Sequence, residues 1–385
     1  MNPRARRLAL TFGGALAAGV ISMSVAVPAG AVKIISPAKP TAKAANPNIR
    51  SVPMAADAAA VKKVVEHWRP ERLKQAKSFT EYTPAAATPM SAKPLVGSRV
   101  PPTAPQLDLP RVAVPPATPT AHGPAGGPNV NLPGTVGKVF FEVDGKEYWC
   151  SATALSSANR NLVATAGHCA YNVQTKQPAQ NWIFVPAYGD GGTPYGIYVG
   201  QTLNLHAAFA TEKDYDYDYA FVNVHSGYKW EQEKGVTDAK GQPVYRPVSV
   251  GRLGDNVGGQ GFDWNRGSKL QVYSFGYPAG SHPNGAAPFD GSVMKWCHST
   301  SKKIAPSPRY RLDQGVGIKC PFTPGASGGP WLAGYNNKTR TGYLVGVNSL
   351  TWDTNADSKY DQISSPYFNA ETAAVYKHAV GVKTG

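Results

Sequence analysis

Short apolar stretches follow one another between Gly137 and Thr351, and turn residues separate them. Residues 139–143 and 147–155 flank the pair Asp144-Gly145, and an Asp-Gly pair between two such stretches is typical of a β-hairpin. Further strands are predicted at residues 162–165, 182–187, 195–203, 219–224, 270–277, 291–297, 310–320 and 343–351. A polar connector at about residues 226–247 divides them into two groups. The pattern predicts an all-β chain with two antiparallel barrels or sandwiches.

Helical spacing of apolar residues appears in two other stretches. Residues 370–380 predict a C-terminal helix, and Asn369 is suited to cap its N-terminus. In residues 60–79, the apolar residues with helical spacing are Val61, Val64, Val65 and Trp68. Pro70 is expected to end or kink this helix, because proline cannot donate a backbone hydrogen bond. Two interpretations stay open: a pro-segment helix that docks on the core, or a transient helix in a tether.

The first third of the chain has a different composition. Of the 34 prolines, 20 lie in residues 1–135, and aromatic residues are sparse before residue 139. Such a stretch buries too little apolar surface to offset the entropy lost on ordering. It predicts a disordered N-terminal region, with a proline-rich linker at residues 83–133. The core is expected in residues 136–385.

The chain begins with the layout of a secretory signal peptide. Three arginines among the first seven residues precede an apolar run at residues 8–27, and Ala29-Gly30-Ala31 offers a cleavage site. An uncleaved signal anchor is the alternative, because the run is long. The pair Arg6-Arg7 leaves the choice between general and twin-arginine export open. The predicted division is a signal peptide at residues 1–31, a pro-segment with linker at 32–135, and one folded, secreted domain at 136–385.

The net charge of +15 is concentrated in the N-terminal region. Residues 1–135 hold 16 of the 39 Lys and Arg but 5 of the 24 Asp and Glu, so the remaining residues carry a net charge of +4. They contain no basic stripe with interleaved aromatic residues, which argues against a nucleic-acid partner. We also expect no membrane contact after signal cleavage.

All four cysteines, Cys150, Cys169, Cys297 and Cys320, lie in the predicted core. An even number in an exported protein predicts two disulfides. Proximity favours Cys150–Cys169 and Cys297–Cys320 among three connectivities, and each would close a loop of about twenty residues worth roughly 3 kcal/mol. The spacing does not match a zinc site, so no metal is expected.

Three motifs supply the groups that hydrolysis through serine requires: a base, a carboxylate that orients it, and amide donors for an oxyanion. His168 lies in ATAGHC, acidic candidates lie in DYDYDYAFV at residues 214–222, and Ser327 lies in GASGGP. With these motifs in this order, and with WCSATALSSANRNLVATAGHC as the first block, the chain resembles the secreted chymotrypsin-like serine peptidases. Within them it resembles the bacterial trypsin-like and glutamyl-endopeptidase-like branch. The resemblance covers about residues 136–355.

The resemblance implies that Cys150 and Cys169 pair and that His168 is the general base. In this family the acid precedes a run of the form x-Ala-hydrophobic-hydrophobic, which selects Asp218; a frame shifted by two residues would select Asp216. Asp214 and Asp216 are otherwise expected on a solvated strand face or loop.

The same likeness makes Ser327 the nucleophile. Gly325 and Ser327 would supply the two N–H donors of the oxyanion hole, since glycine can take a backbone angle closed to other residues. Ala326 stands where trypsin and its close relatives carry an Asp that arms the oxyanion hole after zymogen cleavage. This departure puts a trypsin-type activation switch in doubt. It leaves open steric control, or assistance in folding, by a removable pro-segment.

The block LVGVNSLTW resembles the family strand that lines the substrate groove. By that likeness Ser349 would hydrogen-bond Asp218, and one wall of the specificity pocket would be Leu350 and Thr351. The opposite wall would run from Pro321 to Pro324.

Neither of two known specificities fits this pocket. Cleavage after Lys or Arg would want a carboxylate near Pro321, and Asn348 stands near the position of a pocket histidine in glutamyl endopeptidases. The pocket is expected to be neutral, although His282 or His298 could enter it from loops. The other histidines, including His206, His225 and His378, are expected to be surface or structural residues.

The sequence thus predicts a secreted serine endopeptidase that acts on polypeptides as a monomer without a cofactor. A protease-fold binding protein without turnover is one alternative. An esterase of the α/β-hydrolase type is another, because GASGG matches G-x-S-x-G. That class places Ser before His in the chain, the reverse of the order here, and the α/β alternation is missing.

Overall fold

The computed structural model describes residues 46–80, 102–106 and 129–383. The residues in these three ranges form one compact unit. The predicted signal peptide and most of the predicted linker lie outside the described residues. Within the described ranges, no helix is long and apolar enough to cross a membrane.

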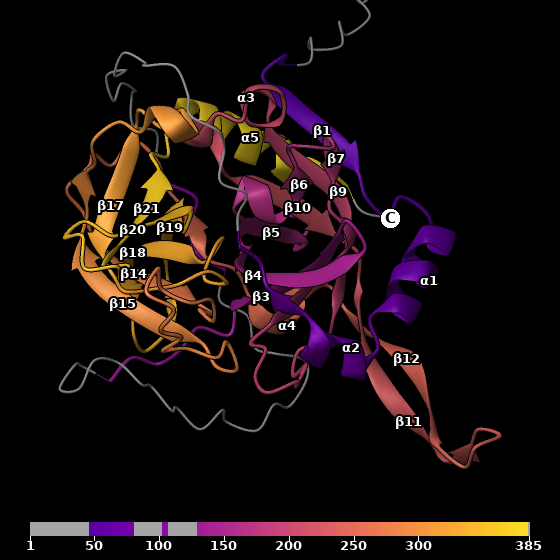
Figure 1. Ribbon diagram of the computed structural model, residues 1–385. Helices are drawn as coiled ribbons and strands as arrows, with labels where there is room; N and C mark the ends of the chain where they lie inside the picture. The colour runs from indigo at the N-terminus through magenta and orange to yellow at the C-terminus, as the bar shows by residue number, and fades with distance from the viewer. Residues whose placement is uncertain (1–45, 81–101, 107–128, 384–385) are drawn as a thin grey trace, which may run out of the picture. The chain divides into compact units, whose positions relative to one another are not determined.

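The first group of strands closes into a six-stranded antiparallel barrel (Figure 1). Its strands, in pairing order, are β5 (Leu162–Thr165), β4 (Lys146–Leu155), β3 (Val136–Val143), β8 (Gln180–Pro186), β9 (Tyr198–His206) and β10 (Ala220–Val224), which pairs again with β5. The β3–β4 hairpin turns at Asp144 and Gly145, whose φ angles are 51° and 72°. Positive φ at both positions is the geometry that an Asp-Gly turn favours, as the sequence predicted.

The second group of strands folds into two packed sheets, antiparallel except for the β13–β19 pair. The five-stranded sheet has the order β13 (Gly261–Phe262), β19 (Thr341–Val347), β18 (Pro330–Asn336), β14 (Gln271–Gly276) and β15 (Lys295–Thr300). The four-stranded sheet has the order β16 (Lys302–Lys303), β17 (Gly315–Lys319), β21 (Gln362–Pro366) and β20 (Leu350–Trp352). Side chains from both sheets, among them Val272, Ile318 and Trp331, form a common core. The predicted all-β class with two halves is confirmed.

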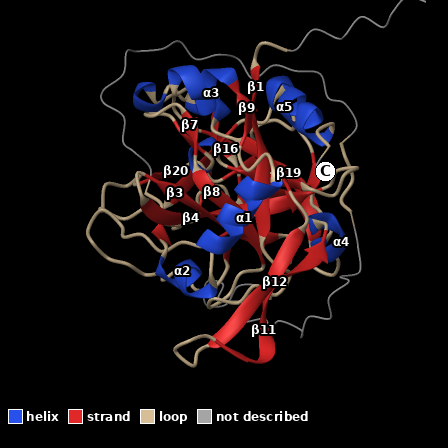
Figure 2. Cartoon of the chain, turned by 90° about the vertical axis from the view of Figure 1, so that its right-hand side faces the viewer, coloured by secondary structure: helices blue, strands red, loops and turns tan. Residues whose placement is uncertain are grey.

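The connector between the halves differs from the prediction. Strands β11 (Gly227–Thr237) and β12 (Pro243–Gly251) pair as a long antiparallel hairpin that runs away from the barrel (Figures 1 and 2). Both faces of its outer part are exposed, so polar residues occupy both faces. The sequence therefore lacks the apolar alternation that marks a half-buried strand, so the polar connector was not predicted to contain two paired strands.

The predicted C-terminal helix is α5 (Ala370–Val380). Asn369 caps it by accepting the N–H groups of Glu371 and Thr372, as expected. The remaining short elements are α3 (Ala207–Glu212), α4 (Leu253–Val257), β6 (Tyr171–Asn172), β7 (Gln177–Pro178) and the 3₁₀ turns Gly167–Cys169, Tyr215–Tyr217 and Pro308–Tyr310.

Residues 46–80 fold onto the first barrel. Strand β1 (Ile49–Pro53) extends the sheet by pairing with β9, helices α1 (Ala58–His67) and α2 (Pro70–Gln75) follow, and β2 (Lys77–Ser78) pairs with β4. Trp68, at the end of α1, is fully buried against Phe140 and donates its indole N–H to the Asn181 carbonyl. Of the two interpretations of this stretch, the docked helix is the one that the structure contains. The expected disorder does not extend to these residues.

Candidate active site

His168 lies where the first barrel meets the second half. It is the middle residue of the 3₁₀ turn that directly follows β5, and it is buried. The disulfide Cys150–Cys169 ties this turn to β4. A side chain at Gly167 would clash, because a Cβ there would lie 2.7 Å from the Phe209 ring and 3.0 Å from Asp218 Oδ1. The Gly-His-Cys sequence thus lets the turn approach Asp218 closely.

Asp218 is fully buried and receives three hydrogen bonds. Its Oδ1 accepts the His168 backbone N–H at 2.9 Å, and its Oδ2 lies 2.8 Å from His168 Nδ1 and accepts the Ser349 hydroxyl at 2.6 Å. Satisfied acceptors make a buried carboxylate tolerable. Since a carboxylate only accepts, Nδ1 carries a proton, which leaves Nε2 of a neutral imidazole as the basic nitrogen. The expected bond from Ser349 to Asp218 is therefore present.

Asp214 and Asp216 do not share a solvated strand face or loop, so that prediction was wrong. Both are buried at the 3₁₀ turn before β10. Asp214 caps this turn by accepting the Asp216 N–H, and Asp216 Oδ1 accepts the N–H groups of Asp313 and Gln314 at 2.9 and 2.7 Å. Burial raises the pKa of Asp216 to about 7, and the nearby acidic groups of Asp214 and Asp313 act in the same direction. Asp216 therefore joins the two halves.

The Ser327 loop is fixed by backbone contacts with the first barrel. Ser327 is half-buried while the residues on either side of it are buried. The Ser151 backbone N–H donates to the Ser327 carbonyl at 2.7 Å, and the Ser151 hydroxyl donates to the Gly325 carbonyl at 2.9 Å. A Cβ on Gly328 would lie 2.1 Å from Thr165 Oγ1 and 2.9 Å from the Ala166 nitrogen. The loop therefore contacts the strand end that leads directly into His168.

Gly325 has a φ angle of +100°, which residues with side chains rarely adopt. A Cβ there would also lie 2.6 Å from the Tyr277 carbonyl oxygen. Glycine at this position is required both by the backbone angle and by the close approach.

Two residues that hold this loop were not identified from the sequence. Asn348 is buried and donates its amide to the Ala326 carbonyl at 2.8 Å, while its side-chain oxygen accepts hydrogen bonds from Ser274 and Trp331. Ser151 makes the contacts described above and also accepts the Tyr277 N–H at 2.9 Å. The sequence signal for each is a polar residue within a mostly small or apolar stretch, Ser151 in CSATAL and Asn348 in VGVNSL. A buried polar side chain in such a stretch is expected to hold a hydrogen-bond network.

The residues predicted to line the specificity pocket come from two segments of the second half, residues 321–324 and strand β20. The Pro324 carbonyl accepts the N–H groups of Ala279 and Gly280, both at 2.9 Å, and Pro321 is exposed. Leu350 and Thr351 pair with Ser364 and Ile363 of β21. Their role in specificity stays a prediction.

The other histidines mostly hold structure. His282 is buried and accepts the Tyr360 N–H at 3.0 Å, and His298 of β15 stacks on Tyr273 of β14. His206 stacks on the Tyr217 ring, His225 hydrogen-bonds the Ala55 carbonyl, and His378 hydrogen-bonds the Ser51 hydroxyl.

Both predicted disulfides, Cys150–Cys169 and Cys297–Cys320, are formed. Cys150, His168 and Cys169 are close enough together to resemble a metal site, but both sulfurs belong to the first disulfide. A thiolate is the form of cysteine that binds metals, so this group does not fit an ion.

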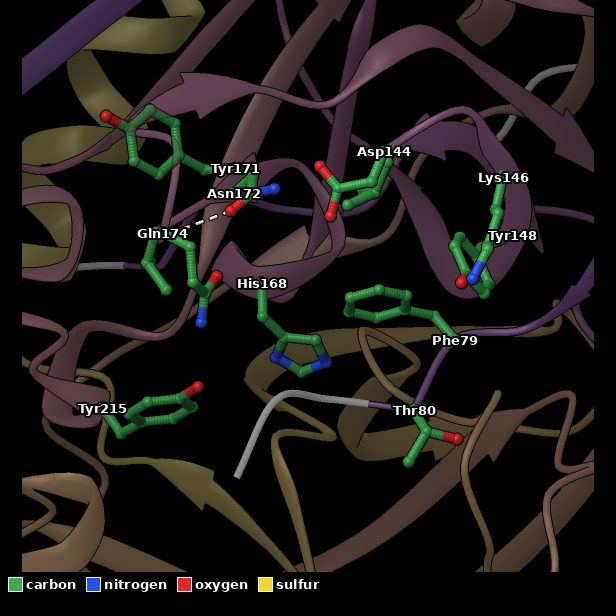
Figure 3. Close-up of a pocket in the computed structure, with 12 residues that line it drawn as sticks. Phe79, Thr80, Asp144, Lys146, Tyr148, His168, Tyr171, Asn172, Gln174 and Tyr215 are labelled. Carbon is green, nitrogen blue, oxygen red and sulfur yellow. Dashed lines mark hydrogen bonds between the residues drawn. The ribbon is translucent and has the colours of Figure 1, made fainter. Parts of the chain in front are cut away.

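A cavity of about 390 Å³ opens beside His168. Figure 3 shows the imidazole with Phe79 on one side and Tyr215 on the other, below Asp144 and Gln174. The cavity therefore brings together the histidine, the β3–β4 turn and residues that follow helix α2.

No protein-family profile matches the sequence, and no curated protein matches it either. Among solved structures, the chain is similar to protease Anisep from Arthrobacter nicotinovorans at 30% identity and a TM-score of 0.50, over 66% of this chain and 99% of that one. It is also similar to a thermostable serine protease, AL20, from an extremophilic microorganism, at 27% identity and a TM-score of 0.52, over 65% of this chain and 98% of that one.

Proposed function

Because the chain belongs to the chymotrypsin-fold serine peptidases, we propose that it is a secreted endopeptidase that cleaves polypeptides through an acyl-enzyme on Ser327. The observation that carries the proposal is the buried bond between Asp218 and His168, at the point where the Ser327 loop contacts the first barrel. A buried ionised carboxylate is costly, and here its contacts are the imidazole, the backbone of the histidine turn and Ser349. These contacts fix the orientation of the His168 imidazole, as a general base requires.

In the first half of the reaction, the Ser327 hydroxyl oxygen attacks the carbonyl carbon of the scissile bond while His168 Nε2 takes the hydroxyl proton. Asp218 stabilises the resulting imidazolium and keeps its own charge. The backbone N–H groups of Gly325 and Ser327 would stabilise the oxyanion, a contribution typically worth a factor on the order of 10² to 10³ in kcat per donor. The imidazolium then gives its proton to the leaving amine, and the carbon–nitrogen bond breaks.

In the second half, His168 takes a proton from water, whose oxygen attacks the ester carbonyl of the acyl-enzyme. The proton passes to the Ser327 oxygen as the ester bond breaks and the acid product leaves. His168 thus carries the transferred proton in both halves of the reaction.

For specificity we propose a neutral pocket, since positions 321, 350 and 351 carry Pro, Leu and Thr. For location, the two disulfides and the leader-like first 31 residues support export.

The function is tested by the variant Ser327→Ala in a casein hydrolysis assay. We expect kcat to fall by a factor on the order of 10⁶, because the nucleophile is lost while the fold is retained. Ser226→Ala, at an exposed position on the first half, is the matched control and should hydrolyse casein at the wild-type rate. Full activity of Ser327→Ala would reject the assignment of Ser327 as the nucleophile.

A further inference from the structure

After helix α2 the chain enters the cavity beside His168. Residues 77–80 form this passage, which we term the occluding segment. Its first two residues make the parallel pairing of β2 with β4, with Lys77 opposite Tyr148 and Ser78 opposite Trp149. The next backbone N–H, that of Phe79, donates to the Trp149 carbonyl at 2.9 Å.

The occluding segment covers the groups to which the proposed chemistry is assigned. The Phe79 ring lies almost parallel to the His168 imidazole, at 23° with 6.1 Å between centroids (Figure 3). Phe79 also makes edge contacts with Phe141 and Tyr148 at 5.3 and 5.2 Å. Ser78 lies against Gly325: its Cβ is 3.1 Å from where a Cβ of that glycine would be. Phe79 thus lies against His168, and Ser78 lies against Gly325 of the Ser327 loop.

The segment also occupies a strand edge that an extended peptide would need. Strand β5 pairs with β4 only from Thr153 to Leu155, so the edge of β4 near Tyr148 and Trp149 is left to another strand. Extended peptides bind proteins by adding to such edges. Since β2 already fills this one, a polypeptide and the occluding segment cannot both pair there.

The anchor of the occluding segment lies outside the cavity. Trp68, Leu73 and Ala76 are buried, and β1 pairs with β9 over five residues. The passage through the cavity is by contrast a two-residue strand followed by one ring and one hydrogen bond. Because the docked helices hold residues 77–80 beside the cavity, this segment has a high effective concentration there. Its own contacts are few, so it can leave the cavity while the helices stay docked.

We infer that residues 77–80 are a built-in competitive inhibitor of the cleft: the chain binds polypeptides only when this segment lifts out while α1 and α2 remain docked. This inference rests on the proposed function and adds its regulation. The apparent affinity for substrate is the affinity of the open form multiplied by the fraction of molecules that are open. If that fraction is about 10% or less, the apparent affinity is at least about tenfold weaker than that of the open form.

The test compares casein hydrolysis by the full wild-type chain, Phe79→Ala and Lys63→Ala. Phe79→Ala removes the ring over His168 and should raise kcat/KM at least about tenfold. Lys63 is exposed on α1, in the same docked segment but away from the cavity, so Lys63→Ala should match the wild type. Thermal unfolding of each variant checks the fold.

An active wild-type chain that Phe79→Ala does not accelerate overturns the inference and leaves the proposed function intact. Inactivity of all three chains while they are folded rejects the proposed function and the inference with it.

If Phe79→Ala does not fold, hydrogen exchange on the full Ser327→Ala chain provides the readout. Casein at concentrations that saturate binding should accelerate exchange at residues 77–80 and leave α1 unchanged. Unchanged exchange at residues 77–80 would overturn the inference.

Discussion

Asp218 and Asp216 show how two residues of one motif acquire different chemistry. Both belong to DYDYDYAFV, and sequence order with the family frame could select Asp218. What Asp216 does could not be predicted, because the N–H groups that it accepts belong to Asp313 and Gln314, about a hundred residues away. The same limit explains why Ser151 and Asn348 were missed: their partners are backbone groups of a distant loop.

The raised pKa of Asp216 predicts a pH-dependent contribution to stability. In the folded chain the group is protonated below about pH 7, whereas in the unfolded chain it ionises near pH 4. The folded state therefore binds more protons between these values. The contribution is greatest at or below about pH 4, falls as the pH rises to about 7, and stays constant above that.

Asp216→Asn removes this titration and keeps an oxygen that can accept the two backbone N–H groups. Relative to the wild type, the variant should gain stability from pH 4 to pH 7, by at most about 4 kcal/mol. Urea unfolding at pH 4, 6 and 8 measures the difference. If the free energies of unfolding of the variant and the wild type differ by the same amount at pH 4, 6 and 8, Asp216 does not titrate as described.

At the scale of elements, turns and helix caps could be predicted from neighbouring residues, whereas contacts with residues distant in the sequence could not. The β3–β4 hairpin follows from Asp144 and Gly145, and α5 follows from its Asn369 cap. The sequence alone does not decide whether α1 docks, because the surface that receives Trp68 is built by Phe140 and Asn181 of the barrel. The β11–β12 hairpin was missed since its outer part has no buried face.

The Cys297–Cys320 disulfide links β15 to the end of β17, and so joins the two sheets of the second half. The Ser327 loop begins directly after Cys320. Replacing both cysteines by serine should lower the free energy of unfolding by about 3 kcal/mol, since the bond closes a loop of 23 residues. Urea unfolding of the double variant and of the oxidised wild type, both without reductant, provides the comparison, because the Cys150–Cys169 disulfide then stays formed in both. A double variant as stable as the oxidised wild type would contradict this expectation.

At the scale of the whole molecule, the proposed site depends on contacts between segments that are far apart in sequence. His168 and Asp218 come from the first barrel, and Ser349 and the Ser327 loop come from the second half. Motif order and family likeness could name these residues in advance. They could not predict that residues 77–80 lie in the same cavity, because nothing in KSFT marks it as a segment that pairs with Trp149.

The most direct measurement of the proposed chemistry is the position at which the folded chain reacts with a fluorophosphonate, located by peptide mass spectrometry. We expect one adduct, on the Ser327 oxygen, formed faster in Phe79→Ala than in the wild type. An adduct on another residue, or none on a folded Phe79→Ala chain, would contradict the assignment of Ser327 as the nucleophile.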